Sequence, residues 1–141
     1  MSGPIWQKNT SVEALNKRNA NTLGEHVGME VTELGDDYLI VSMPVDERTH
    51  QPMGLLHGGA SVALAETVGS IAANIAVDAN HFCVGMEINA NHVKAVRSGT
   101  VYGKATPLHL GRTSHVWEIK ITTKAGDLVC ISRLTMAVRK R

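Results

Sequence analysis

Aromatic residues and net charge are both scarce in this chain. Phe, Trp and Tyr together make up 4% of the 141 residues, so a stacking platform for nucleic-acid bases is not expected. The formal net charge is +1, and the basic residues are scattered along the sequence rather than clustered. Nucleic-acid binding, which would need a basic patch, is therefore excluded as the main function.

Sequence signatures of metal, phosphate and serine chemistry are also missing. The seven histidines form no H-x-x-x-H pair and no Cys/His cluster with metal spacing. There is no phosphate-binding loop and no G-x-S-x-G elbow. Cys83 and Cys130 stand alone inside apolar, strand-like runs, which predicts buried, reduced thiols rather than a metal or redox site.

Targeting and membrane signals are missing as well. The N-terminal stretch MSGPIWQKNTSVEALNKRN lacks the basic-then-apolar layout of a signal peptide. No apolar stretch is expected to be both long enough and free enough of charge to span a bilayer. We therefore expect a cytoplasmic protein with no membrane partner.

The chain does contain enough apolar residues for one core. With 43% hydrophobic residues and no repeat or linker, residues 1–141 are predicted to form a single domain. A short amphipathic helix is predicted at 11–19, with Thr10 or Ser11 as its N-cap, and a helix that is apolar nearly all round at 58–77. Strands are predicted at 26–34, 38–45, 83–92, 100–110, 113–123 and 128–138, the first two joined by a turn at 35–37.

The order of these elements predicts an α+β fold. The last four strands are joined by connections too short for crossovers, so we expect them to be antiparallel neighbours. The apolar helix is buried most simply if the sheet curls around it. The expected architecture is therefore a ββαββββ order, with one antiparallel sheet wrapped around the long helix and a short helix in front.

A single carboxylate, Glu66, interrupts the apolar helix. A glutamate is almost never fully buried without a partner, and no Lys, Arg or His lies at helical spacing to pair with it. One interpretation places Glu66 on a narrow exposed stripe. The other holds it in an apolar cleft for chemistry, with Ser70 on the same helix face as a hydrogen-bond donor.

The start of the same helix carries the sequence His-Gly-Gly. The glycines either satisfy the dihedral angles of the turn or let a ligand approach the free amide of Gly58, which could stabilise an oxyanion. Gly58 and Glu66 are about 12 Å apart along a helix, whereas reacting groups lie within about 3 Å of one another. One helix cannot supply both groups to one substrate, but two antiparallel helices can. If both groups act, we expect at least a dimer with sites shared across its interface.

Longer stretches resemble the hotdog-fold acyl-CoA thioesterases. They are MPVDERTHQPMGLLHGGASVALAETVGS, VGMEINANHVKAVRSGTVYGKATPLHLGRTSHVWEIKI and SRLTMAV. The Q-P-x-G-x-x-H-G-G-x-x-x-x-x-x-E pattern is the specific part, and the resemblance extends from about Val12 onward. Within the family, the chain is similar to the bacterial enzymes that hydrolyse 1,4-dihydroxy-2-naphthoyl-CoA in menaquinone synthesis. It is also similar to the proofreading thioesterases of enterobactin synthesis.

The resemblance implies roles for five residues. Glu66 would be the catalytic carboxylate, acting as nucleophile or general base, and the Gly58 N–H would polarise the thioester carbonyl. Gln51 and His57 would help to hold that carbonyl and the attacking water. Ser70, one turn after the glutamate, would position the carboxylate.

Further residues are implied at the substrate. His92 would line the acyl pocket, an assignment that strand alternation supports, although a structural role for this histidine stays open. Alternation places Val84, Met86, Ile88, Ala90 and His92 on one apolar face. Met53 stands near the pocket mouth where an aromatic residue is more usual in the family, and Arg97 and Arg112 are candidates to contact the CoA nucleotide.

The resemblance also bears on partners. Coenzyme A would be part of the substrate, with no separate cofactor and no metal. The acyl group could instead arrive on an acyl carrier protein, and a hotdog domain that only binds acyl-CoA is the alternative from another class. The implied assembly is a homotetramer, formed as a dimer of dimers.

Overall fold

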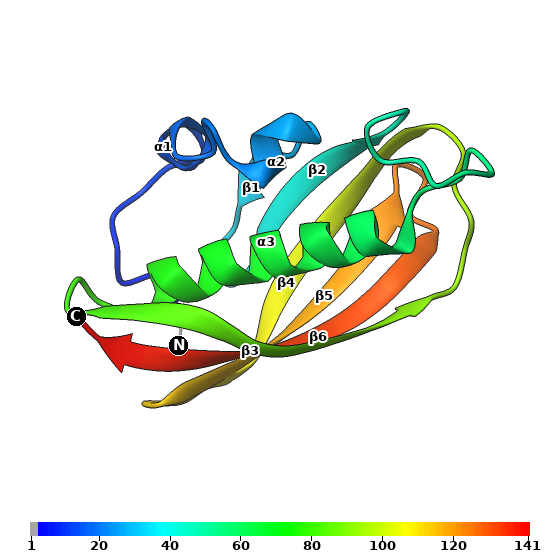
Figure 1. The fold of residues 1–141 in the computed structure, drawn as a ribbon. Coiled ribbons are helices and arrows are strands. Elements are labelled where there is room, and N and C mark those ends of the chain that lie inside the picture. The colour runs from blue at the N-terminus through cyan, green and yellow to red at the C-terminus, as the bar shows by residue number, and fades with distance from the viewer. Residues whose placement is uncertain (1–2) are drawn as a thin grey trace.

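The long helix and the six strands follow one another along the chain in the order that the sequence predicts. The computed structural model describes residues 3–141, in which a six-stranded antiparallel sheet curls around one long helix, α3 (Gly58–Ala76) (Figure 1). The strands are β1 (Glu30–Leu34), β2 (Leu39–Val45), β3 (His81–His92), β4 (Gly99–Leu110), β5 (Ser114–Thr123) and β6 (Leu128–Lys140). The expected α+β architecture and ββαββββ order are confirmed.

Helix α3 is the core helix of this arrangement. It contacts β2, β3, β4, β5 and β6, and Leu64, Val68 and Ala72 on its inner face are fully buried. Its length of 19 residues and its apolar composition do meet the criteria for a membrane-spanning segment, so the expectation that no stretch would do so is wrong. A helix enclosed by a sheet needs the same composition, because it must be apolar on most sides.

Strand β3 departs from the predicted topology. The order in the sheet is β1-β2-β4-β5-β6-β3, so β3 pairs with β6 at the far edge and is not a neighbour of β4. The connection at residues 93–98 must cross three inter-strand spacings, about 14 Å, and six extended residues reach about 20 Å. The predicted pairing of β3 with β4 is wrong because a short connection can still cross the end of a curled sheet.

A bulge in β3 also overturns part of the predicted strand alternation. Met86 has no partner in register on β6, so the strand bulges at this residue. Val84, before the bulge, is 45% exposed, and Met86, at the bulge, is 64% exposed, whereas Ile88 and Ala90 after it pack against the core. The predicted common face of these residues is therefore wrong for Val84 and Met86, because one extra residue reverses the alternation.

The N-terminal segment contains one helix that was predicted and one that was not. Helix α1 (Val12–Lys17) is capped by Ser11, whose Oγ accepts a hydrogen bond from the Ala14 N–H at 3.1 Å. Helix α2 (Leu23–His26) is a single turn capped by Thr22, so β1 begins at Glu30 rather than at His26. Both short helices lie over one side of α3 (Figure 1).

The two cysteines behave as the sequence predicts. Cys83 and Cys130 are buried and unpaired. Burial raises the pKa of both thiols above the ordinary value, which keeps them protonated at neutral pH.

Candidate active site

The first turn of α3 presents a free backbone amide. His57 is the N-cap residue, and its Nδ1 accepts a hydrogen bond from the Gly59 N–H at 2.8 Å. Within residues 3–141 no group accepts a hydrogen bond from the Gly58 N–H. Because the helix N-terminus carries a partial positive charge, this amide can bind a carbonyl oxygen or an anion.

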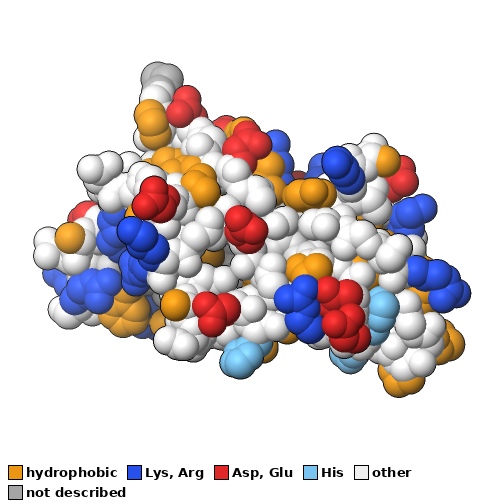
Figure 2. Space-filling model, turned by 90° about the horizontal axis from the view of Figure 1, so that it is seen from above, with side chains coloured by type: hydrophobic (Ala, Val, Ile, Leu, Met, Phe, Trp, Pro, Cys, Tyr) orange, Lys and Arg blue, Asp and Glu red, His pale blue; other side chains and the backbone are white. Residues whose placement is uncertain are grey.

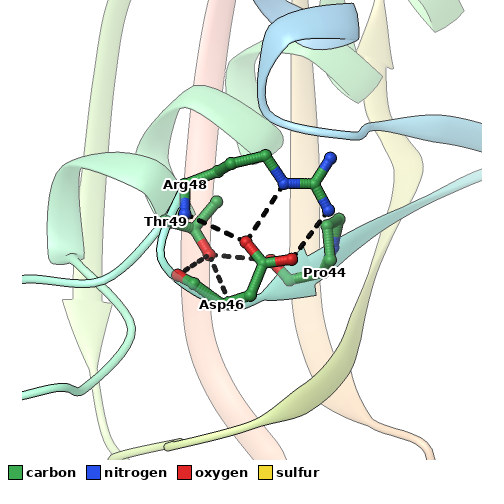
Figure 3. A network of polar contacts seen from close by, with 4 residues as sticks. All are labelled: Pro44, Asp46, Arg48 and Thr49. Carbon is green, nitrogen blue, oxygen red and sulfur yellow. Dashed lines mark hydrogen bonds and ion pairs between the residues drawn. The ribbon is translucent and has the colours of Figure 1, made fainter.

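The loop that precedes α3 is held to the end of β2 by a compact polar network (Figure 3). The Arg48 guanidinium binds both carboxylate oxygens of Asp46, at 3.1 Å and 2.7 Å, and the Arg48 backbone N–H donates to the same carboxylate. These bonds hold the pKa of the Asp46 carboxyl below its usual value. The Thr49 hydroxyl donates to Pro44 O at 2.7 Å, and the Thr49 carbonyl accepts from the His57 N–H at 2.8 Å. The start of α3 is therefore tied to β2 through Thr49, which is buried.

Gln51 lies in this loop with its side chain folded back on the backbone. Its Oε1 accepts hydrogen bonds from the N–H groups of Met53, at 2.5 Å, and Leu55, at 3.5 Å. The amide nitrogen of Gln51 forms no hydrogen bond with the described residues. Met53 is 71% exposed and does not line the cavity that Glu66 borders, so its place at a pocket mouth stays a prediction.

Glu66 sits on a half-buried stripe along the outer side of α3. The stripe consists of Val62, Ala63, Glu66, Thr67, Ser70, Ile71 and Asn74. Its carboxylate forms no ion pair or hydrogen bond with any residue in the range 3–141. The interpretation of an exposed stripe is thus only partly right, because this stripe is half-buried and borders a cavity.

The cavity has a volume of about 420 Å³ and lies between α3, the two short helices and strands β1 and β2. Glu66, Ser70 and Asn74 provide polar groups on its α3 side. Its apolar lining comes from Leu15, Leu23, Met29, Val31, Val41, Ile71 and Ile75. The Ser70 hydroxyl contacts Met136 Sδ at 3.9 Å, and its backbone carbonyl accepts from the Asn74 side chain. Ser70 and Glu66 thus share a cavity wall without a hydrogen bond between them.

Within a single chain, the candidate site residues lie in two separate groups. His92 lies at the start of α3, where a Cβ added to Gly58 would be 3.0 Å from its Nε2. Gln51, His57, Gly58 and His92 are therefore gathered at one end of the helix, whereas Glu66 and Ser70 lie at its middle, about 12 Å further along. His92 is placed beside the free amide rather than beside the carboxylate.

The two candidate arginines lie at opposite ends of the sheet. The backbone carbonyl of Arg97 is 2.8 Å from His50 Nε2, which places Arg97 beside the loop at the start of α3. Arg112 is exposed in the β4–β5 turn, next to Thr113, whose carbonyl binds the N–H of Val138 near the other end (Figure 1). One chain does not bring these two side chains together.

The charge on the surface is mixed. Seen from the side of α1 and α2, acidic and basic side chains are interspersed with apolar ones (Figure 2). Across residues 3–141, no group of three His, Cys, Asp or Glu side chains is arranged to hold a metal ion.

Sequence reasoning missed Gly85, the residue of β3 that faces Glu66. An ideal Cβ built on Gly85 would lie 2.5 Å from Glu66 Oε2. A glycine inside a strand pattern is a signal for a bulge or a close approach, and here both features occur. Thr49 was also missed, because its role depends on hydrogen bonds that no local pattern predicts.

The fold and this site define a class of protein. The profile of the thioesterase superfamily matches residues 53–130, and the chain belongs to that superfamily of thioester hydrolases. The proofreading thioesterase EntH of Cronobacter turicensis is 54% identical, with 95% of this chain and 98% of that protein aligned. The 1,4-dihydroxy-2-naphthoyl-CoA hydrolase of Escherichia coli K12 is 47% identical, over 95% of this chain and 98% of that protein.

A solved structure agrees with these matches. A thioesterase crystal structure from Haemophilus influenzae superposes with a TM-score of 0.95 at 47% sequence identity, covering 96% of this chain and 95% of that one. The hotdog fold and the thioesterase resemblance predicted from the sequence are confirmed.

Proposed function

We propose that the protein hydrolyses acyl- or aroyl-CoA thioesters with Glu66 as the catalytic carboxylate. The observation that carries the proposal is a half-buried carboxylate with no partner among the described residues, on the wall of a largely apolar cavity. Burial without a counter-ion is costly for a carboxylate, so such a group is a candidate for chemistry rather than for stability.

The chemistry follows from two groups. Glu66 would accept a proton from water, which attacks the thioester carbonyl carbon, or would attack that carbon itself; we favour the general base. The Gly58 amide would stabilise the negative charge that develops on the carbonyl oxygen. The tetrahedral intermediate would then expel the CoA thiolate. Because a thiolate is a good leaving group, no strong general acid is required, and neither a metal nor a separate cofactor is proposed.

A second copy of the chain would complete each site. Antiparallel pairing of two α3 helices would put the Gly58 end of one beside the Glu66 region of the other. The same pairing would bring the Arg112 end of one copy toward the Arg97 end of its partner, where the CoA nucleotide could bind. Strand β3 supports this arrangement, since it is a long edge strand whose outer side pairs with no other strand in residues 3–141. We extend the proposal to a dimer of such dimers in the cytoplasm.

The acyl group is proposed from the cavity and the relatives. A cavity of about 420 Å³ with mostly apolar walls falls in the size range of small-molecule sites and would take an aryl ring or an alkyl chain. The name of the Escherichia coli relative favours 1,4-dihydroxy-2-naphthoyl-CoA, and with it menaquinone biosynthesis. The name of the Cronobacter relative favours a proofreading role, with the acyl group on a carrier protein.

A thiol-release assay tests the proposal. Initial rates would be measured with 1,4-dihydroxy-2-naphthoyl-CoA, benzoyl-CoA, a medium-chain acyl-CoA and a benzoyl-loaded acyl carrier protein, for the wild type and for Glu66→Gln. We expect CoA substrates to turn over and the isosteric amide to lose about 10²- to 10⁴-fold in kcat, because it cannot accept the proton. A folded Glu66→Gln protein within a few fold of wild type would remove Glu66 from the mechanism. Saturable binding of all four substrates without turnover by the wild type would instead favour the non-catalytic alternative.

A further inference from the structure

We propose that Gly85 is a positioning residue for the Glu66 carboxylate: its missing side chain leaves the space on β3 that the carboxylate occupies. The inference rests on the proposed role of Glu66 and adds the feature that sets where its oxygens lie. The supporting observation is the 2.5 Å separation between Glu66 Oε2 and an ideal Cβ on Gly85.

This distance is too short for any side chain larger than hydrogen. Ordinary van der Waals contact with a Cβ begins at 3.4 Å, so an alanine at position 85 requires a relative displacement of about 1 Å. The other neighbours are more distant, with Glu66 Cδ at 3.6 Å and Met136 Sδ at 3.9 Å. The carboxylate oxygen is thus the atom that conflicts with an alanine at this position.

The strand has little freedom to make that displacement. Two residues before Gly85, the backbone N–H and carbonyl of Cys83 are both bound by the side chain of Asn74, on α3. On its other side, Gly85 is in register with Met136 of β6. Because β3 is held from both directions, we infer that the carboxylate, at the end of a flexible side chain, would move instead.

The substitution should therefore affect chemistry much more than folding. The φ angle of Gly85 is not in the left-handed region, so alanine can adopt this backbone conformation without strain. A shift of about 1 Å in a reacting group can lower turnover by about 10²-fold. Groups that bind the rest of the substrate are untouched, so KM should stay within about threefold of the wild-type value.

The test compares kcat, KM and the thermal midpoint of Gly85→Ala with those of wild type, using whichever CoA thioester gives the highest rate. Val84→Ala is the matched control, because it changes the neighbouring, exposed side chain of the same strand. We expect Gly85→Ala to lose about 100-fold in kcat while its thermal midpoint stays near that of wild type. Val84→Ala should keep both values.

A second pair of variants assigns the loss to the contact with Glu66. In Glu66→Asp the carboxylate is retracted by one methylene, about 1.5 Å, and no longer meets a Cβ at position 85. Adding Gly85→Ala to Glu66→Asp should therefore change its residual kcat by less than about twofold, in contrast to the loss of about 100-fold when Glu66 is intact.

The outcomes separate this inference from the proposed function. Wild-type kcat in Gly85→Ala overturns the positioning role, and equal losses with Glu66 intact and in the Glu66→Asp background do the same. If Gly85→Ala lowers the thermal midpoint, the substitution is repeated in Glu66→Ala: recovery there supports the contact, and a persistent loss assigns Gly85 to strand structure alone. An active Glu66→Gln protein would instead show that the proposed function has failed.

Discussion

The side-chain amide of Asn74 binds the backbone of Cys83 both as a hydrogen-bond acceptor and as a donor. Its Oδ1 accepts from the Cys83 N–H at 2.8 Å, and its Nδ2 donates to the Cys83 carbonyl at 3.2 Å and to the Ser70 carbonyl at 2.9 Å. One amide thereby joins α3 to the edge strand β3. It also satisfies two backbone groups of an edge strand that no other strand within residues 3–141 reaches on that side.

Replacing Asn74 by alanine should destabilise the protein. The substitution leaves the Cys83 N–H and carbonyl without their partner, which we expect to cost about 1–3 kcal/mol in the free energy of unfolding. Urea unfolding measures this loss. Asn74→Asp separates the two halves of the contact: its carboxylate can accept from the Cys83 N–H but cannot donate to the Cys83 and Ser70 carbonyls, so it should also be less stable than wild type. Equal stabilities for Asn74→Ala and wild type would mean that these hydrogen bonds contribute nothing net.

A shared active site predicts complementation between two inactive variants. One variant is Glu66→Ala, and the other combines Gln51→Ala with Gly58→Pro, which removes the backbone N–H yet is tolerated at a helix start. In a mixed dimer, both lesions fall in one site and the other site is intact. Co-expression with two different tags, followed by purification of the mixed species, should give about half the wild-type activity.

The control for that experiment is the pair of homodimers, each of which should be inactive. A mixed dimer that forms and is as inactive as its parents would contradict the shared site. The carboxylate and the oxyanion donor would then have to act within one chain, despite their separation of about 12 Å along α3.

The N-cap bond of His57 predicts different effects for two substitutions. Asparagine is among the best N-cap residues, so His57→Asn should keep the hydrogen bond to the Gly59 N–H and the thermal stability. His57→Ala loses the cap and should cost about 1 kcal/mol. Thermal unfolding compares the two proteins. If both variants are equally stable, the Nδ1 contact is not a stabilising cap; if His57→Asn keeps stability but loses activity, the imidazole ring acts on the substrate.

Stability should fall on mild acidification because of His115. Burial lowers its pKa below the ordinary value, with a further contribution from His109, and its Nδ1 accepts from Trp117 Nε1 at 3.3 Å. The unfolded chain therefore binds this proton more readily than the folded protein. As the pH falls below about 6.5, the unfolded state gains stability relative to the folded one until the folded pKa is passed.

Urea unfolding between pH 8 and pH 5 measures this dependence. His115→Asn retains an acceptor for Trp117 and does not titrate, so its profile should be flatter than that of wild type over the same interval. His26→Asn, at an exposed position, is the control and should leave the profile unchanged. A profile that is identical in all three proteins would rule out His115 as the source.

Local signals in the sequence predicted the local structure well. Ser11 as a cap, the turn at 35–37 and the start of α3 at Gly58 all follow from residue preferences that act over a few positions. The position of β3 was not predictable in this way, because its pairing with β6 depends on long-range contacts rather than on the length of the connection to β4. The bulge at Met86 was missed for a similar reason, since one unpaired residue leaves no mark in the alternation that precedes it.

The residues of the candidate site show the same difference between local signals and long-range contacts. Glu66 was visible in the sequence because a lone carboxylate in an apolar helix is unusual, and Gly58 because glycine at a helix start exposes an amide. Gly85 and Asn74 were not singled out, since each acts through a contact with a residue on another element. Sequence patterns thus pointed to the proposed reacting groups but not to the residues that hold them in place.

The pairing of β3 with β6 has a consequence for the order in which the protein assembles. During synthesis, β3 emerges from the ribosome before β4 and β5, yet its hydrogen-bonding partner emerges only after both of them. Until then β3 has no neighbouring strand, and the space beside Glu66 has no wall on that side. Such non-local pairing slows folding, because a long loop must close before its contacts form. The helix that carries Glu66 is therefore synthesised well before the strand pairing that fixes β3 beside it, so the site proposed around Glu66 can form only after the C-terminal strand is in place.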